Sequence, residues 1–206
     1  MSLWMFKKLR PFFVTLAFSP LALLAGCGPS AFVNGQYDDV NSANLMDDTW
    51  SETDMQVVAK SLVDSMMQSG AIQQATKPPL VMVTNLQNKT MEHIDTQSIM
   101  DKIRVAVMRS GKVQFVDKEA REDIKSEYDY QGSGNMSDFD KKGPGSQKSA
   151  DLIVNGRLDS VTKEVGKAKT VYYKITLNLT NLKTAVIVWS DEKEIRKKFK
   201  KQSIGL

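Results

Sequence analysis

The sequence predicts an α+β fold: a single domain built on a mixed, mostly antiparallel sheet of four to five strands, packed with helices and preceded by a signal peptide and a short tether. Residues 171–180 alternate apolar and polar side chains with the period of a strand. Residues 51–69 and 95–110 instead repeat apolar side chains every three or four positions, as an amphipathic helix does. Short apolar runs at 80–83 and 113–116 flank the second helix, and this strand–helix–strand order favours a right-handed crossover between parallel strands.

The first 26 residues have the pattern of a secretory signal. Lys7, Lys8 and Arg10 make the start basic, and no acidic residue accompanies them. The apolar run at 12–24 is too short for a membrane span and has the length of a signal-peptide core.

Cys27, the only cysteine in the sequence, is the predicted lipidation site. It closes the stretch Leu-Ala-Gly-Cys at 24–27, which resembles the bacterial lipobox, where signal peptidase II cuts before a lipidated cysteine. Acyl chains such as palmitate would anchor the mature protein on a membrane, because two chains already bind stably. Lipoproteins resembling this one that stay in the inner membrane carry Asp after the cysteine. Gly28 stands there instead, so we expect the outer membrane, with the protein facing the periplasm. The alternatives are a signal peptide with a chance cysteine and a signal anchor.

These features divide the chain into a lipoprotein signal peptide at 1–26, a lipidated, flexible periplasmic tether at 27–49 and a globular domain at 50–206. The tether is predicted because residues 28–49 are rich in Gly, Asn, Ser and Asp and lack helical or strand periodicity. Fully extended it reaches at most about 70–80 Å, and as a flexible coil it spans about 25 Å.

The charge of the chain gives no case for a nucleic-acid partner. The chain has 28 basic and 24 acidic residues, for a formal charge of +4, but three of the basic residues belong to the signal. The mature chain therefore has 25 basic against 24 acidic residues, which provides no electrostatic footprint for a polyanion.

The first half of the predicted domain begins with a capped helix. Ser51 and Asp54 stand three positions apart and match a capping box. The run at 80–83 is apolar without alternation, which predicts a strand buried on both faces. The segments expected after it are a polar loop over 85–93, a helix over 95–110 ended by Gly111, a strand over 113–116 and a charged surface helix over 118–128. Residues 131–146 are rich in Gly and Ser and predict a mobile loop; a phosphate cradle is disfavoured because no Gly-Lys-Ser/Thr occurs there.

The strongest strand signal is a hairpin near the C-terminus. An apolar run at 150–154 leads into a long strand, and the chain turns at 166–169. The side of the next strand that is predicted to be buried carries Val171, Tyr173, Ile175, Leu177 and Leu179. The chain then turns at 181–184 and returns at 185–189. Residues 192–201, with Ile195 and Phe199 as their only apolar anchors, either prolong this last strand or form a solvated tail.

The polar side of this hairpin is the candidate partner-binding surface. It offers Tyr172, Lys174 and Thr176, with Lys183 and Thr184 at the turn. An exposed tyrosine beside cationic and hydroxyl groups suits recognition, because aromatic side chains supply contact area at a low entropy cost. The alternative is an ordinary solvated or helix-covered sheet face.

The sequence contains no catalytic constellation. His93 is the only histidine and stands in a polar segment, and no cluster of His, Cys and Asp has metal-ligand spacing. No nucleophile has an evident base beside it. We therefore expect a protein that is not an enzyme, with no metal and no cofactor other than the covalent lipid on Cys27.

The order of these segments resembles the LpoB-type outer-membrane lipoproteins, which activate class A penicillin-binding proteins, the peptidoglycan synthases. The segments that carry the resemblance are the lipobox, Leu80-Val81-Met82-Val83 with Asn88-Lys89-Thr90 after it, Ser110-Gly111-Lys112, the strand at 113–116, Ala150-Asp151-Leu152-Ile153-Val154 and Val186-Ile187-Val188-Trp189-Ser190. Enteric members of the family carry a long, Pro-rich tether, and the short, Pro-poor tether of this chain departs from that pattern.

The resemblance implies a small α+β domain that activates a synthase allosterically and so regulates cell-wall synthesis and cell shape. The implied partners are a class A penicillin-binding protein and the outer-membrane lipid that receives the acyl chains; we expect a monomer. The alternative is a structural or secretion-associated periplasmic lipoprotein, because the curli secretion channel subunit is built on a related core. That function needs long membrane-inserting hairpins, for which this chain has no room.

Overall fold

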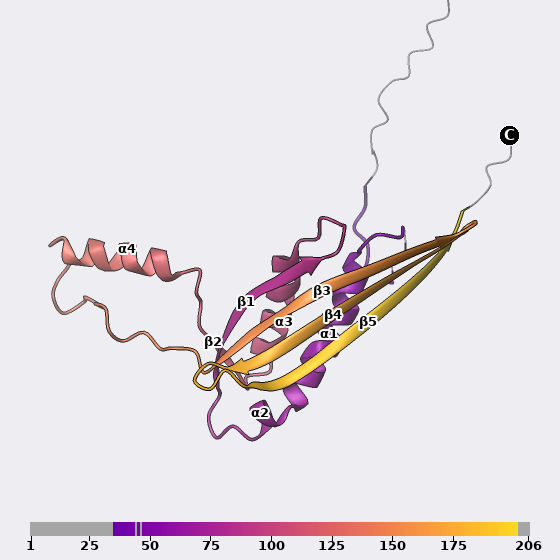
Figure 1. The fold of residues 1–206 in the computed structure, drawn as a ribbon. Helices are drawn as coiled ribbons and strands as arrows, with labels where there is room; N and C mark the ends of the chain where they lie inside the picture. The colour runs from indigo at the N-terminus through magenta and orange to yellow at the C-terminus, as the bar shows by residue number, and fades with distance from the viewer. Residues whose placement is uncertain (1–34, 44, 46, 202–206) are drawn as a thin grey trace, which may run out of the picture. The chain divides into compact units, whose positions relative to one another are not determined.

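The computed structural model describes residues 35–43, 45 and 47–201, and the described residues from Asp39 onward lie in one compact unit (Figure 1). The elements of this part of the chain are, in order, α1 (Glu52–Gln68), α2 (Gly70–Gln73), β1 (Leu80–Lys89), α3 (Thr96–Arg109), β2 (Gln114–Phe115), α4 (Arg121–Gly132), β3 (Leu152–Val165), β4 (Ala168–Asn181) and β5 (Ile187–Lys200). The predicted signal peptide and Cys27 lie outside the described residues.

The five strands form one mixed sheet in the order β2-β1-β3-β4-β5. β1 pairs in parallel with β2 and with β3, whereas β3 with β4 and β4 with β5 form antiparallel pairs. The antiparallel ladders are the longer ones, because each joins strands of 14 residues along nearly their full length. The predicted α+β class with a mixed sheet is therefore confirmed.

Helices α1 and α3 pack on one face of the sheet and build the core with it (Figure 1). The inward row of β4 is the one that the sequence predicted, and each member is at most 1% exposed: Val171, Tyr173, Ile175, Leu177 and Leu179. The helices contribute Val58, Leu62, Met66, Ile99 and Ile103 to the same cluster. Burying an apolar side chain of this size contributes about 1.5–3 kcal/mol, so this single layer of side chains is the main source of stability.

The ends of the two long helices follow from local sequence. The Asp54 N–H donates to Ser51 Oγ (3.3 Å) and the Ser51 N–H donates to Asp54 Oδ2 (2.8 Å), which is the predicted capping box. Asp95 Oδ1 caps α3, and Gly111 follows its end with φ +68°, a left-handed conformation that favours glycine. Because β1 and β2, which precede and follow α3 in the chain, pair in parallel, the predicted parallel pairing across this connection is confirmed.

The burial of β1 differs from the prediction. Residues 80–83 were expected to be buried on both faces, but only Val81 and Val83 are buried, whereas Leu80 and Met82 are half-exposed. The reason is that α1 and α3 lie on one face of the sheet, and an apolar run alone does not indicate how many layers cover it.

The length of β1 also differs from the prediction. The strand continues to Lys89, so the loop expected over 85–93 is wrong for its first half. The register with β3 shifts between Val83 and Leu86, and the parallel pairing resumes at Leu86, which is opposite Gly156. The polar residues of this half pair with the longer strand β3, and local polarity does not reveal that pairing.

The charged segment 192–201 prolongs β5, which is one of the two alternatives that its sequence left open. The ladder with β4 continues to the pair Lys200 and Ala168. Along this charged run, more buried and more exposed side chains still alternate, as they do in a strand.

Helix α4 begins at Arg121, later than the predicted residue 118. Asp117 Oδ1 accepts the backbone N–H groups of Glu119 (2.9 Å) and Ala120 (3.2 Å), and this local turn occupies the positions where the helix was expected to start. α4 lies apart from the sheet in Figure 1.

Candidate partner-binding face

The side of the sheet opposite α1 and α3 carries the polar residues of the hairpin. Tyr172, Lys174 and Thr176 alternate with the buried residues of β4, and each is half-exposed. The strand register places residues of β3 and β5 beside them on the same side. We call this surface the open face; its residues are Asn155, Arg157, Asp159, Tyr172, Lys174, Thr176, Asn178, Ser190, Glu192, Glu194 and Arg196.

Hydrogen bonds and ion pairs join β4 to β5 on the open face. The Tyr172 hydroxyl donates to Glu194 Oε1 (2.5 Å), and this bond to a carboxylate raises the pKa of Tyr172 to about 12. The Arg196 guanidinium lies 6.0 Å from the centre of the Tyr172 ring. Lys174 Nζ lies 3.5 Å from Glu192 Oε2. Exposed pairs of this kind contribute only about 0–1 kcal/mol each to stability. Their consequence is a fixed array of charges and one aromatic ring that a partner can recognise.

A shallow polar groove of about 760 Å³ adjoins this array. The residues that line it are Thr84, Asn85, Gln87, Lys118, Asn155, Gly156, Arg157, Thr176 and Asn178. β3 supplies its centre, because Arg157 is opposite Thr176 and Asn155 is opposite Asn178 in the register. Amides, hydroxyls and two cations suit hydrogen bonding to a polar protein surface. The sequence analysis did not predict this groove. Pairing the predicted strand after residue 150 with the next strand would have placed their polar residues side by side.

Lys183 and Thr184 are exposed in the turn beyond the end of β4. Their backbone N–H groups both donate to Asn181 Oδ1, at 3.0 and 3.1 Å. The structure therefore brings together three of the five predicted partner-binding residues and holds the other two at the turn.

A buried ion pair lies where the chain enters the domain. Lys197 Nζ is 2.6 Å from Asp54 Oδ2 and donates to the Thr49 carbonyl (2.5 Å), and the two charged side chains are only 3% and 6% exposed. Lys197 is in the segment 192–201, for which the sequence analysis gave two alternatives, a continued strand or a solvated tail. The missed signal is its position between Ile195 and Phe199, which share its side of β5.

Tyr173 connects this ion pair to the segment before α1. Its hydroxyl donates to Glu92 Oε1, and Glu92 Oε2 accepts the Trp50 N–H (2.9 Å). Burial, and then the bond to the Glu92 carboxylate, raise the pKa of Tyr173. Asp48 pairs with Lys169, and this interaction lowers the pKa of Asp48. These contacts fasten residues 48–50 to the start of β4 and the end of β5.

The described residues contain no group of three or more His, Cys, Asp and Glu side chains that could hold a metal ion. No helix in the part of the chain that the structure describes is long and apolar enough to span a membrane.

Comparison with known proteins identifies the family. The family model "Peptidoglycan-synthase activator LpoB" matches residues 54–195, which extend from α1 into β5. The match therefore covers the core, the groove and most of the open face. The chain belongs to the LpoB family of peptidoglycan-synthase activators.

Several solved structures are similar to this chain at low identity. The LpoB C-terminal domain from Salmonella enterica is 15% identical, with a TM-score of 0.42, and the alignment covers 69% of this chain and 98% of that one. The LpoB C-terminal domain from Escherichia coli is 13% identical, with a TM-score of 0.42 and the same coverages of 69% and 98%. Lipoprotein GNA1162 from Neisseria meningitidis is 12% identical, with a TM-score of 0.39 and coverages of 62% and 88%. A comparison with curated protein sequences finds no match.

Proposed function

We propose that this protein is a non-catalytic outer-membrane lipoprotein that binds and activates a class A penicillin-binding protein, and thereby regulates cell-wall synthesis. The observation that carries the proposal is the family match over residues 54–195, which extends from α1 into the last strand of the sheet.

The anchor of the proposed lipoprotein is lipid on Cys27, at the start of a tether over 27–49 that leads to the domain at 50–206. Metabolic labelling with palmitate tests this part. The wild-type protein should be labelled, and Cys27→Ser should accumulate as an unlabelled precursor or soluble protein. Labelling that persists in the variant would contradict lipidation at this residue.

Activation in this proposal is allosteric. The lipoprotein has a higher affinity for the active conformation of the synthase than for the inactive one, and so shifts the synthase population towards activity. The open face provides the recognition surface, because its charges and tyrosine are already held by Glu192 and Glu194. The tether raises the effective concentration of the domain at the cell wall.

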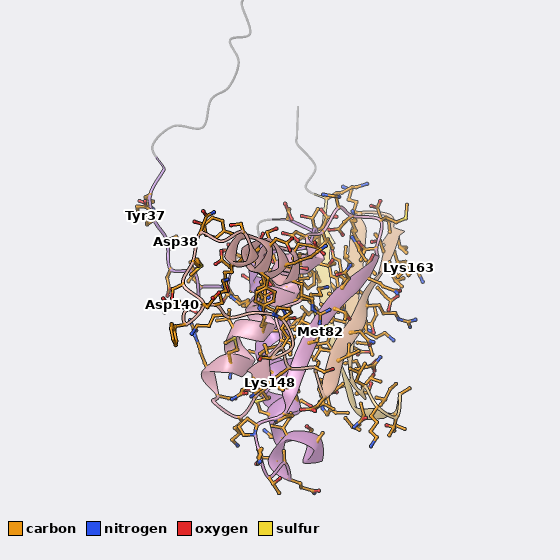
Figure 2. The ribbon with its side chains drawn as sticks, turned by 90° about the vertical axis from the view of Figure 1, so that its left-hand side faces the viewer. Tyr37, Asp38, Met82, Asp140, Lys148 and Lys163 are labelled. Carbon is orange, nitrogen blue, oxygen red and sulfur yellow. The ribbon has the colours of Figure 1, made fainter. Side chains whose placement is uncertain are left out.

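A double charge reversal on the candidate surface tests the binding. Lys174→Glu with Lys183→Glu removes the ion pair of Lys174 with Glu192 and should lower the free energy of unfolding by no more than about 1 kcal/mol, because exposed pairs contribute little. Affinity for the purified synthase should fall severalfold or more. The matched control is Lys102→Glu with Lys148→Glu, two exposed lysines outside the open face; Lys102 is on α3, and Lys148 is labelled in Figure 2.

The two variants give separable outcomes in a surface-binding titration. Unchanged affinity of a folded Lys174→Glu/Lys183→Glu variant would exclude this surface, and equal losses in both variants would indicate only a general effect of charge. A wild-type protein that assembles into a ring-shaped oligomer and binds no synthase would instead support the secretion-associated function.

A further inference from the structure

Exposed apolar side chains gather at the turn between β4 and β5. Leu182, Val186, Ile187 and Val188 are 45%, 57%, 54% and 40% exposed. Single exposed apolar residues are ordinary, but four within one turn form a patch, and such patches mark interaction sites. We call these four residues the apolar tip.

Backbone hydrogen bonds hold the apolar tip in one conformation. The Asn181 N–H donates to the Val186 carbonyl (2.8 Å), and the Ala185 N–H donates to the Asn181 carbonyl (2.8 Å). The Leu182 N–H donates to the Asp151 carbonyl (2.9 Å), which fastens the turn to the segment entering β3. A surface that is already ordered loses little entropy on binding, and this favours a role in recognition.

The apolar character continues across the sheet from the tip. Ile187 is opposite Thr180 on β4, Thr180 is opposite Ile153 on β3, and Ile153 is opposite Met82 on β1. Ile153 and Met82 are half-exposed, and Met82 is labelled in Figure 2. Three apolar side chains, with Thr180 between Ile187 and Ile153, therefore border the polar open face at this end.

The apolar tip and the tether are at opposite ends of β4. The tether side is marked by the pair Asp48 and Lys169 near the start of the strand, and β5 also ends there, with Lys200 opposite Ala168. The 14 residues of β4, at about 3.4 Å each, separate the two ends by about 45 Å. A partner can therefore reach the tip without obstruction by the chain that enters the domain at the other end.

We infer that the apolar tip inserts into an apolar pocket of the peptidoglycan synthase; this inference rests on the proposed function. The tip supplies desolvated contact area, and the adjoining open face supplies the polar contacts around it, as in the core and rim of other interfaces. Neither the entering chain nor the end of β5 lies at this end of β4, so neither of them covers the tip.

Two matched double variants of the full-length lipoprotein, purified in detergent, test the inference. Val186→Ser with Ile187→Ser changes the apolar tip. Val57→Ser with Val105→Ser changes two comparably exposed residues, at 46% and 42%, on α1 and α3, which cover the opposite face of the sheet. We expect the tip variant to bind the purified class A synthase at least tenfold more weakly than wild type, and the control variant to bind within twofold. Thermal unfolding verifies that both are folded, and Leu182→Asn replaces the tip variant if it is not.

The other outcomes would overturn either the inference about the tip or the proposed function. Binding by the tip variant within twofold of wild type, or an equal loss in the control, would overturn the inference while leaving the proposed function intact. Self-association of the wild type that only the tip variant abolishes, measured by sedimentation, would make the tip an interface between copies and would also overturn it. Absence of wild-type binding to any class A synthase would overturn the proposed function itself.

Discussion

Removal of the buried ammonium group of Lys197 should destabilise the domain strongly. Lys197→Met keeps most of the apolar stem but leaves the Asp54 carboxylate buried without its cation, and it removes the hydrogen bond to the Thr49 carbonyl. Breaking a buried ion pair by removing one partner costs about 3–5 kcal/mol. Asp54 Oδ2 keeps two donors, the N–H and Oγ of Ser51 at 2.8 and 2.9 Å, so the lower end of that range applies. We therefore expect a loss of about 3 kcal/mol in the free energy of unfolding.

Urea unfolding followed by tryptophan fluorescence measures this loss, because Trp50 packs edge-on against the Tyr173 ring at 5.3 Å. Lys197→Met with Asp54→Asn leaves no buried charge and should recover to within about 1 kcal/mol of wild type. Lys198→Met, the exposed neighbour on β5, is the control and should change stability by less than about 0.5 kcal/mol. A single variant that loses less than about 1 kcal/mol, or a double variant no more stable than the single, would refute the reasoning.

Three further predictions concern backbone geometry and one buried hydroxyl. Gly156→Ala should lower stability by about 2–3 kcal/mol, because an added Cβ would lie 2.1 Å from the Thr176 carbonyl oxygen; an unchanged melting temperature would contradict this. Ala185→Gly should raise the free energy of unfolding by about 0.5–1 kcal/mol, because Ala185 has φ +58°, a conformation that favours glycine. The urea midpoint should rise accordingly, and a lower midpoint would contradict this prediction. Burial and the Glu92 carboxylate raise the pKa of Tyr173 above its ordinary value of 10.0, so the unfolded chain ionises first and stability falls as pH rises above about 10. Tyr173→Phe should lose less stability than wild type between about pH 9 and pH 11, and equal losses in parallel urea titrations would exclude this cause.

The parts of the fold that could be predicted are those written in local periodicity. The alternation around Tyr173 and Ile175 marks the buried side of β4, because a strand turns successive side chains to opposite faces. The capping box of Ser51 and Asp54 likewise depends on four consecutive residues. Such patterns place each element without knowledge of its neighbours.

The features that escaped prediction depend on contacts between distant segments. The burial of Lys197 requires Asp54, which is far away in the sequence, and a run of charges by itself indicates solvent. The groove requires the register that sets Arg157 opposite Thr176. The half-exposure of Met82 requires knowledge that the helices cover one face of the sheet. Tyr172, Lys174 and Thr176 could be placed on one face from their alternation, but their partners Glu192 and Glu194 could not.

Glycan-strand polymerisation by a purified class A penicillin-binding protein, measured with and without the detergent-solubilised full-length protein, tests the proposed activation most directly. We expect the rate to rise and to saturate as the full-length protein is titrated, and we expect Lys174→Glu/Lys183→Glu to require a higher concentration for the same rise. A polymerisation rate that stays unchanged at wild-type concentrations that saturate binding would contradict activation.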